Sequence, residues 1–351
     1  MNISVFGAGN SGLAMAAHLS RDGHRVVLWN RSKETIEELI ETPKITAEGM
    51  IEGTFPIDVV TDDIKVAVED PDLILITTPA NAHRELAEMI AKNIKRSTLI
   101  VLNPGRTFGA LEFREVYAKY NKHLEQDIAE TQTIVYTCRK TGPRSVNVVA
   151  LKADVLLSTF NPAENQRIIA QLPTSLRRFF IPARSLVETS IGNVGMILHS
   201  APLLLNTGWT ENEYKTYKYY YDGITPSISR LIEKLDEERV AVSKKLGCQV
   251  ERTKDWLKRS YGLEGENLFD VIQKNDAYKT IEAPAVLNHR YIMEDVPYGL
   301  VPLEAIGKKL NLRMQTTSLI IDLASSIMEI DFRKIGRTIQ DYNGLLLEKA
   351  Q

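Results

Sequence analysis

The glycine pattern near the start of the chain constrains the fold more than any other stretch. A short apolar run, Ile3–Phe6, leads into Gly7-Ala-Gly-Asn-Ser-Gly12, and a helical pattern of apolar residues follows. A strand, a G-x-G-x-x-G turn and a helix in this order form the phosphate-binding unit of dinucleotide-binding domains. The first glycine permits the tight turn, the second lets a pyrophosphate approach the backbone, and the third lets helix and strand pack closely. The sequence therefore predicts a dinucleotide cofactor bound by Gly7, Ala8, Gly9, Asn10, Ser11 and Gly12.

The residues after the second predicted strand bear on which dinucleotide is bound. The first helix ends near Asp22-Gly23, and His24–Trp29 is typical of the next strand. Sites that prefer NAD usually carry Asp or Glu at the end of that strand, where it binds the ribose 2′-hydroxyl. Here the residues are Asn30, Arg31 and Ser32, so a guanidinium can pair with a 2′-phosphate and no carboxylate repels it. This favours NADP(H), with NAD(H) still possible and a solvated polar turn as the alternative.

Further apolar runs in the first half predict strands at Leu73–Thr78, Leu99–Leu102, Thr133–Tyr136 and Val146–Leu151, with a helix over Asn81–Ile94. Alternating strands and helices predict a doubly wound parallel sheet, in which ligands bind at the carboxyl ends of the strands. We therefore expect Thr78 and Pro79 to contact the cofactor and Asn103 to contact the substrate. The alternative is that these residues only form the turns that end strands.

The second half of the chain has a different character. Strand-like runs stop after Pro182, which predicts a Rossmann domain over 1–182 and a helical domain over 183–351. Thr225-Pro226 has the pattern of an N-cap followed by proline at the first helical position, and it opens a helix that stops at Gly247. Further helical patterns cover Glu251–Tyr261, Pro302–Leu310 and Gln315–Met328.

The stretch Glu188–Asn206 predicts one helix with two unlike faces. At 100° per residue, one face carries Gly192, Gly195, His199, Pro202 and Asn206, and the opposite face carries Val194, Ile197, Ala201, Leu204 and Leu205. Two glycines and a proline lower helix propensity, so the small-residue face suggests room for a ligand beside His199. The alternative is a buried helix whose histidine bonds to a neighbouring backbone group.

The stretch Asn288–Pro302 predicts a rigid loop, because Pro297, Gly299 and Pro302 restrict or turn the backbone. It brings one guanidinium, Arg290, together with carboxylates, which suits a site that binds charged groups. A surface loop with solvated charges would have the same composition.

Composition excludes several classes of protein. The 351 residues suggest two domains, and a net charge of −2 gives no reason to expect nucleic acid or an anionic membrane as partner. Cys138 and Cys248 form no C-x-x-C pair, which argues against a disulfide framework or a thiolate zinc site. No signal peptide is visible and no apolar run approaches the roughly 18 residues of a membrane helix. We expect a soluble cytoplasmic protein without a metal.

Taken together, these motifs resemble the opine dehydrogenase family, which includes the octopine and nopaline types. Besides the glycine pattern, the similar blocks span nearly the whole chain: Asn103-Pro-Gly, Cys138-Arg with Gly142-Pro143, Asn193 through His199-Ser-Ala-Pro202, and Arg290-Tyr with Glu294–Pro302. The resemblance implies an α/β Rossmann domain followed by an all-helical domain similar to that of 6-phosphogluconate dehydrogenase, with catalysis at the cleft.

The resemblance also implies a reaction. An amino acid and a 2-oxo acid such as pyruvate form an imine, which NAD(P)H reduces to an N-(carboxyalkyl) amino acid, and the reverse oxidation is possible. His199 matches the catalytic histidine of the family, Asp295 its carboxylate partner, and Arg290 the clamp for a carboxylate. Asp322 is the alternative partner of His199.

Two other functions fit the same sequence. The first is a simple 2-oxo-acid or β-hydroxyacid reductase, but such enzymes commonly use a lysine in the interdomain helix, and Glu188–Asn206 contains none. The second is a protein that senses NADP(H) without turnover. The presence of Gly192, Gly195 and His199 argues against a sensor. Hydrophobic helices in the second domain also make a homodimer plausible.

Overall fold

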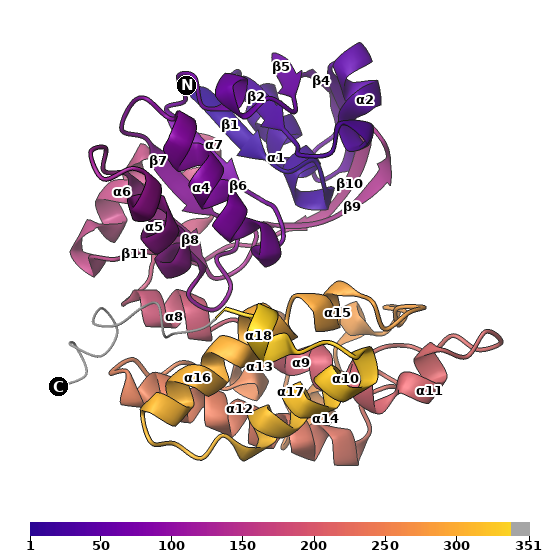
Figure 1. The fold of residues 1–351 in the computed structure, drawn as a ribbon. Coiled ribbons are helices and arrows are strands. Elements are labelled where there is room, and N and C mark those ends of the chain that lie inside the picture. The colour runs from indigo at the N-terminus through magenta and orange to yellow at the C-terminus, as the bar shows by residue number, and fades with distance from the viewer. Residues whose placement is uncertain (338–351) are drawn as a thin grey trace. The chain divides into compact units, whose positions relative to one another are not determined.

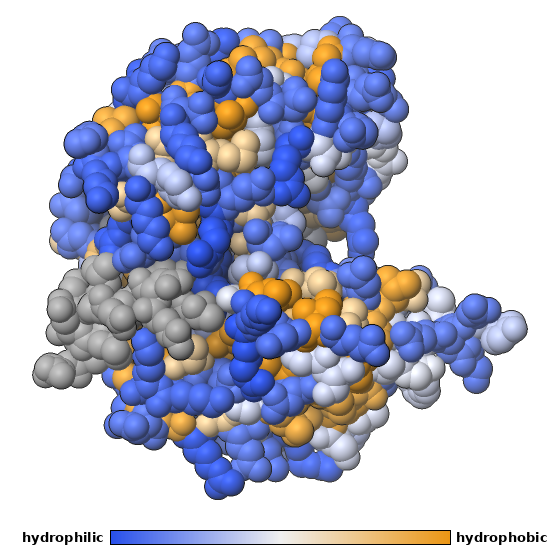
Figure 2. Space-filling view, in the orientation of Figure 1, coloured by the Kyte–Doolittle hydropathy of each residue, from blue (hydrophilic) through white to orange (hydrophobic). Residues whose placement is uncertain are grey.

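The computed structural model describes residues 1–337 and divides the chain into two compact units, Met1–Ser190 and a second that begins at Ile191. Figure 1 shows a sheet with helices in the first unit and helices alone in the second. Within residues 1–337, every helix is either too short or too polar to span a membrane. Hydrophilic side chains cover most of the surface of the first unit in the view of Figure 2.

The first unit is built on an eight-stranded sheet. Its spatial order is β12 (Phe180–Pro182), β11 (Val155–Thr159), β8 (Asp127–Thr131), β7 (Leu99–Leu102), β6 (Leu73–Ile76), β1 (Asn2–Phe6), β2 (Arg25–Trp29) and β5 (Val59–Thr61). All neighbours are parallel except β11, which is antiparallel to β8. The central strands β6 and β7 are buried at every residue, because helices cover both faces of a parallel sheet. The predicted doubly wound fold is confirmed.

The helices of this unit follow the strands in the alternating order that the sequence predicts. They are α1 (Asn10–Arg21), α2 (Lys33–Glu41), α3 (Ile64–Ala67), α4 (His83–Asn93), α5 (Gly109–Tyr120), α6 (Asn165–Gln171), α7 (Thr174–Arg177) and α8 (Leu186–Ile191), with short 3₁₀ turns η1 (Ala80–Ala82) and η2 (Pro162–Glu164).

A second, four-stranded sheet was not predicted. Its order is β4 (Gly53–Pro56), β3 (Lys44–Gly49), β10 (Ser145–Leu151) and β9 (Tyr136–Gly142), and it packs against α1. The predicted strand Thr133–Tyr136 is wrong, because pairing with β10 begins only at Tyr136. The run Val146–Leu151 is a strand but belongs to this smaller sheet. Strand β9 escaped prediction because its alternate residues are exposed and polar, so it has no apolar run.

The described residues of the second unit form helices joined by loops, with one isolated β-bridge between Lys218 and Glu282. Its helices are α9 (Gly195–Leu198), α10 (Ser200–Leu205), α11 (Thr207–Thr210), α12 (Pro226–Lys245), α13 (Thr253–Tyr261), α14 (Leu268–Gln273), α15 (Arg290–Met293), α16 (Val301–Lys309), α17 (Gln315–Met328) and α18 (Phe332–Ile335), with η3 (Asp276–Tyr278) and the π-helical turn η4 (Val296–Leu300). The predicted start of α12 is confirmed, since Thr225 Oγ1 accepts from the Ile228 N–H at 3.3 Å.

The prediction of one helix over Glu188–Asn206 is wrong. The stretch forms α8, α9 and α10, with breaks at Gly192–Val194 and at His199. Pro202 explains the second break, because it has no N–H to donate to the Leu198 carbonyl and its ring crowds that carbonyl. The predicted inward face is buried except at Leu205, which is 42% exposed.

The predicted loop over Asn288–Pro302 is also wrong, because most of it is helical. Turn α15 is followed by η4 and then α16, with Pro297 and Pro302 at their first turns, where a missing N–H costs nothing. The prolines therefore begin helices here instead of stiffening a loop.

The two units divide at Ser190/Ile191, whereas the sequence places the change at 182. The buried carboxylate of Glu130, at the end of β8, accounts for the difference. It accepts from Thr189 Oγ1 at 2.8 Å and from Ser190 Oγ, which holds α8 on the first unit.

Candidate active site

The glycine turn follows β1 directly and ends in the first turn of α1. Gly7 has a φ of +108°, which favours glycine, and its N–H donates to the Trp29 carbonyl at 2.8 Å. A Cβ on Gly12 would lie 1.7 Å from the Gly7 carbonyl oxygen, whereas a Cβ on Gly9 would meet no atom within 4 Å. The turn is therefore closed at Gly12, where helix and strand pack, and open at Gly9, where a pyrophosphate would approach.

The other residues of the turn support the same function. Ala8 is buried, and Asn10 and Ser11 begin α1, so their N–H groups lie at a helix N-terminus that favours anions. The first turn of α1 has no acidic residue to oppose a phosphate. The residues present therefore fit a dinucleotide.

The residues after β2 lie beside this turn. Asn30 Oδ1 accepts from the Ala8 N–H at 3.1 Å, and Asn30 Nδ2 donates to the Ser32 carbonyl at 3.0 Å. Asn30 thus ties two turns together, which leaves Arg31 as the charged group at the end of β2. Arg31 pairs with Glu85 of α4 at 2.5 Å, and both side chains are more than half exposed. Lys33, exposed at the start of α2, is a second cation that the sequence reading missed.

The carboxyl ends of β6 and β7 hold the next predicted residues. Thr78 borders the glycine turn, and its buried Oγ1 has no hydrogen-bond partner within residues 1–337, which suits a polar ligand; Pro79 is exposed. Asn103 is buried, donating to the Val101 carbonyl at 3.2 Å and accepting from Thr131 Oγ1 at 3.4 Å. Both hydrogen bonds of the Asn103 amide are thus made to residues of β7 and β8. Its contact with substrate stays a prediction.

Glu130 is a residue near this edge that the sequence reading missed. Its carboxylate is fully buried and accepts from the Ala110 N–H at 2.9 Å. A Cβ on Gly105 would lie 2.2 Å from Glu130 Oε2, so the Asn103-Pro-Gly stretch needs glycine to pass this carboxylate. A lone glutamate in a strand without an apolar run gave no signal of this role.

In the second unit, the structure pairs His199 with Asp295. His199 Nδ1 lies 2.7 Å from Asp295 Oδ2, and the side chains are 16% and 2% exposed. A buried carboxylate on Nδ1 fixes the orientation of the imidazole. The alternative partner is excluded by geometry, because Asp322 pairs with Arg333 at 2.5 Å.

Two tyrosines complete the surroundings of the histidine. The ring of Tyr291 stacks on the imidazole of His199 with centroids 4.0 Å apart and planes 13° from parallel. The buried Tyr219 hydroxyl donates to the His199 carbonyl and lies 3.4 Å from the Leu198 carbonyl. It thus satisfies backbone oxygens near the break that Pro202 creates. Tyr219 belongs to a run of tyrosines to which the sequence alone gives no role.

The helices around His199, Asp295 and Tyr291 are closely packed. A Cβ on Gly299 would lie 2.8 Å from Met196 Cβ, so only glycine lets η4 approach α9 this closely. The buried Arg239 donates to the Ile191 carbonyl at 2.8 Å and to Asp236 Oδ1 at 2.8 Å, which fixes the chain just before Gly192.

Arg290, the predicted carboxylate clamp, is exposed one residue before Tyr291. Its guanidinium carbon lies 5.6 Å from the centre of the Tyr291 ring. No carboxylate within the described residues pairs with it. The structure therefore brings His199 together with Asp295 and Tyr291, and Arg290 lies beside Tyr291.

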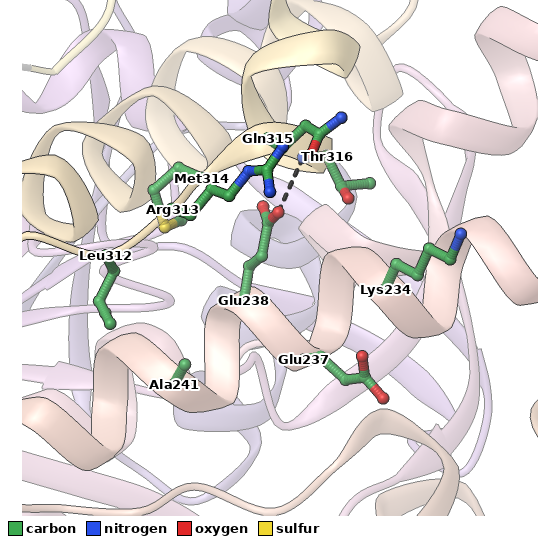
Figure 3. Close-up of a pocket in the computed structure, with 9 residues that line it drawn as sticks. All are labelled: Lys234, Glu237, Glu238, Ala241, Leu312, Arg313, Met314, Gln315 and Thr316. Carbon is green, nitrogen blue, oxygen red and sulfur yellow. Dashed lines mark hydrogen bonds between the residues drawn. The ribbon is translucent and has the colours of Figure 1, made fainter.

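A separate hollow of the second unit lies between α12 and the segment before α17 (Figure 3). Glu238 projects into it and accepts from the Thr316 and Thr317 N–H groups at 2.8 Å each. This carboxylate caps the N-terminus of α17, and none of the predicted site residues lines the hollow.

Comparisons with known proteins agree with both halves of this description. Residues 2–135 match the family described as NAD-dependent glycerol-3-phosphate dehydrogenase N-terminus. Residues 182–328 match NAD/NADP octopine/nopaline dehydrogenase, alpha-helical domain, a range that includes His199 and Asp295.

Whole-length relatives extend the agreement. Opine dehydrogenase of Arthrobacter sp. (strain 1C) is 38% identical over 338 residues, which are 96% of this chain and 93% of the relative. The structure of octopine dehydrogenase with NADH and L-arginine has a TM-score of 0.80 at 18% identity and covers 99% of this chain and 97% of its own. Yersinopine dehydrogenase with NADP⁺ has a TM-score of 0.79 at 14% identity, covering 100% and 97%. These two structures show the shared fold.

The relative from Arthrobacter is similar along nearly the entire chain, and the family of the helical domain covers the histidine–aspartate pair. The predicted family is confirmed: the chain belongs to the opine dehydrogenases, NAD(P)-dependent oxidoreductases that act on CH–NH groups and reductively condense an amino acid with a 2-oxo acid.

Proposed function

We propose that His199 is the acid–base group of this reaction and that Asp295 orients it. The 2.7 Å bond between Nδ1 and the buried carboxylate carries this proposal. When bound, the dinucleotide supplies or accepts the hydride. His199 Nε2 moves the proton that balances the hydride transfer, and the Asp295 carboxylate stabilises the imidazolium that forms on protonation.

Arg290 is proposed to bind the carboxylate of the 2-oxo acid. A guanidinium forms two parallel hydrogen bonds with a carboxylate, which fixes the direction of the keto carbon toward the imidazole. The exposed Arg290 side chain beside the His199–Tyr291 stack suits this role. Pyruvate is the proposed 2-oxo acid, since octopine dehydrogenase has been solved with pyruvate.

NADP(H) is the proposed cofactor. Asn30 offers no carboxylate for a ribose 2′-hydroxyl, and Arg31 and Lys33 supply two cations near the end of β2. The Arg31–Glu85 pair competes only weakly, because exposed ion pairs contribute about 0.2–1 kcal/mol. A 2′-phosphate, which accepts two charge-assisted bonds, would replace Glu85 as the partner of Arg31.

The test follows oxidation of NADPH with pyruvate alone and then with pyruvate plus a panel of amino acids, L-arginine included. An absolute requirement for the amine supports reductive condensation, whereas turnover with pyruvate alone would make the enzyme a simple reductase. Cofactor binding without turnover across the panel would support a sensor. Light scattering of the purified protein tests the proposed homodimer.

His199→Ala is expected to leave cofactor affinity nearly intact and to lower kcat by about 10²–10⁴-fold, as for loss of an acid–base group. His123→Ala is the matched control, since that histidine lies in the first unit. An unchanged kcat for His199→Ala would remove it from the mechanism.

A further inference from the structure

Strand β9 of the smaller sheet presents a lysine to the glycine turn. The backbone N–H of Lys140 donates to Asn10 Oδ1 at 2.8 Å, and Lys140 Nζ lies 3.4 Å from the Ala8 carbonyl oxygen. Along β9, Cys138 and Lys140 are half-buried, whereas Arg139 between them is exposed. The alternation of a strand therefore turns Lys140, and not its neighbour, toward α1 and the turn.

The charge of Lys140 lacks a close counter-charge. Its only hydrogen-bond partner through Nζ in the described chain is the Ala8 carbonyl, and no carboxylate of residues 1–337 lies within ion-pair distance. Burial lowers the pKa of the ammonium, and the more distant charge of Glu38 opposes that effect. A partly desolvated cation is costly unless an anion joins it.

An anion has room beside this ammonium. The Gly9 position is open, the N-terminus of α1 points its N–H groups at the same turn, and the first turn of α1 carries no acidic side chain. The backbone of the turn supplies hydrogen bonds and partial charge but no full positive charge. Lys140 is the group that can add one.

We propose that Lys140 binds the pyrophosphate of the dinucleotide, so that the smaller sheet contributes a full positive charge to the phosphate site formed by the glycine turn. This inference rests on the proposed use of that turn for a dinucleotide, and it is independent of the choice between NADP(H) and NAD(H). It also explains why a four-stranded sheet packs against α1: the sheet carries β9 to the phosphate end of that helix.

The competing interpretation is structural, with Lys140 only fastening β9 to the Ala8 carbonyl. Replacement of the side chain separates the two, because the bond from the Lys140 backbone N–H to Asn10 survives any substitution except proline. A structural role would lower thermal stability and weaken every ligand alike. A phosphate role would weaken only ligands that carry the pyrophosphate.

The experiment measures binding to the full-length enzyme without turnover. Titration calorimetry gives the affinity for ADP-ribose, which has the pyrophosphate, and ligand-observed NMR gives that for adenosine, which has none. Lys140→Gln is expected to weaken ADP-ribose about 10- to 100-fold, as for loss of a charge-assisted bond, and to leave adenosine unchanged. Lys140→Arg should restore part of the loss. Arg139→Gln, the same change on the exposed face of β9, should alter neither affinity by more than about twofold.

Three results would overturn the proposal. They are an unchanged ADP-ribose affinity in Lys140→Gln, an equal loss for adenosine, and an equal effect of Arg139→Gln. The proposed reaction is judged separately, because wild-type enzyme that binds ADP-ribose but fails to condense any amine with pyruvate would refute that reaction alone. Wild-type enzyme that binds neither ADP-ribose nor its 2′-phosphate would refute the dinucleotide site and this inference with it.

Discussion

At the scale of single residues, the second unit orients its histidine with one buried carboxylate and one aromatic ring. Asp295 bonds Nδ1 of His199, and Tyr291 stacks on the face of the imidazole ring. The hydrogen bond and the stacked ring together restrict rotation of the imidazole. The remaining nitrogen keeps a defined direction.

Asp295→Asn is expected to lower kcat by about 10²–10⁴-fold, because an amide can keep the contact but cannot stabilise an imidazolium. Steady-state kinetics with saturating cofactor measures the effect. Asp322→Asn is the control, because that carboxylate pairs with Arg333 away from His199. Equal losses in the two variants would contradict the assignment of Asp295.

Arg31→Gln is expected to weaken binding of 2′-phospho-ADP-ribose about 10- to 100-fold and to change ADP-ribose little. Glu85→Gln removes the competing carboxylate and should strengthen the 2′-phosphorylated ligand about two- to fivefold, since an exposed pair is weak. Calorimetric titration of both ligands checks both variants. Wild-type enzyme that binds ADP-ribose more tightly than its 2′-phosphate would show NADP(H) to be the wrong cofactor.

At the scale of elements, the broken helix α8–α9–α10 is the feature that places His199. Pro202 removes a hydrogen bond at the junction of α9 and α10, and the Tyr219 hydroxyl supplies a donor to the carbonyls there. The buried Arg239 holds the earlier end of the segment through the Ile191 carbonyl. The break is thus a fixed feature of the fold, because other elements satisfy its backbone groups.

Tyr219→Phe removes that donor and leaves buried carbonyls less satisfied, at a cost of about 1–3 kcal/mol of unfolding free energy. The histidine backbone should shift, lowering kcat about tenfold or more with little change in cofactor affinity. Tyr217→Phe is the matched control, because its hydroxyl bonds Thr210 Oγ1 at 2.9 Å instead. Comparable stability loss in both variants with equal kcat would argue against a positioning role for Tyr219.

At the scale of the whole molecule, buried titratable groups in the two units give each unit its own response to acid. In the first unit, burial is the main cause that lowers the pKa of His18 to about 4, with the Arg21 charge acting in the same direction. In the second unit, burial opposes but does not prevent a lowering of the pKa of Glu304 to about 2, caused by hydrogen bonds from Arg333, Lys308 and Ser318.

The first unit should lose stability as the pH falls from about 6.5 to about 4, because His18 takes up a proton in the unfolded chain across that window but not in the folded one. The loss approaches about 3 kcal/mol at most. Urea unfolding followed by fluorescence at several pH values measures it. His18→Gln should flatten this dependence, and an unchanged slope in that variant would refute the assignment.

The second unit should hold until lower pH. Glu304 is ionised in the folded state down to about pH 2, so its contribution is complete above about pH 4.5 and is lost as the pH falls from there toward 2. Glu304→Gln should unfold more easily at neutral pH and depend less on pH across that lower window. A wild-type protein in which helical signal is lost entirely above pH 4.5 would contradict this order.

The dinucleotide turn, the order of the main strands along the chain and the long helices can be predicted from the sequence, because each rests on a local pattern. The glycine positions follow from backbone sterics within six residues, α12 follows from its Thr225 cap, and α17 follows from the periodicity of its apolar residues. His199 and Asp295 were also predicted as partners, through motifs that resemble a family, with Asp322 left as the alternative. No local pattern could choose between the two carboxylates, because 96 positions separate His199 from Asp295.

Features that depend on distant partners could not be predicted from the sequence. Glu130 draws α8 onto the first unit, Tyr219 satisfies the carbonyls at a proline break, and β9 becomes a strand because β10 pairs with it. The local sequence around these residues does not reveal their roles, because a carboxylate, a hydroxyl and a polar segment are also common on exposed surfaces. Long-range hydrogen bonding determined where they lie.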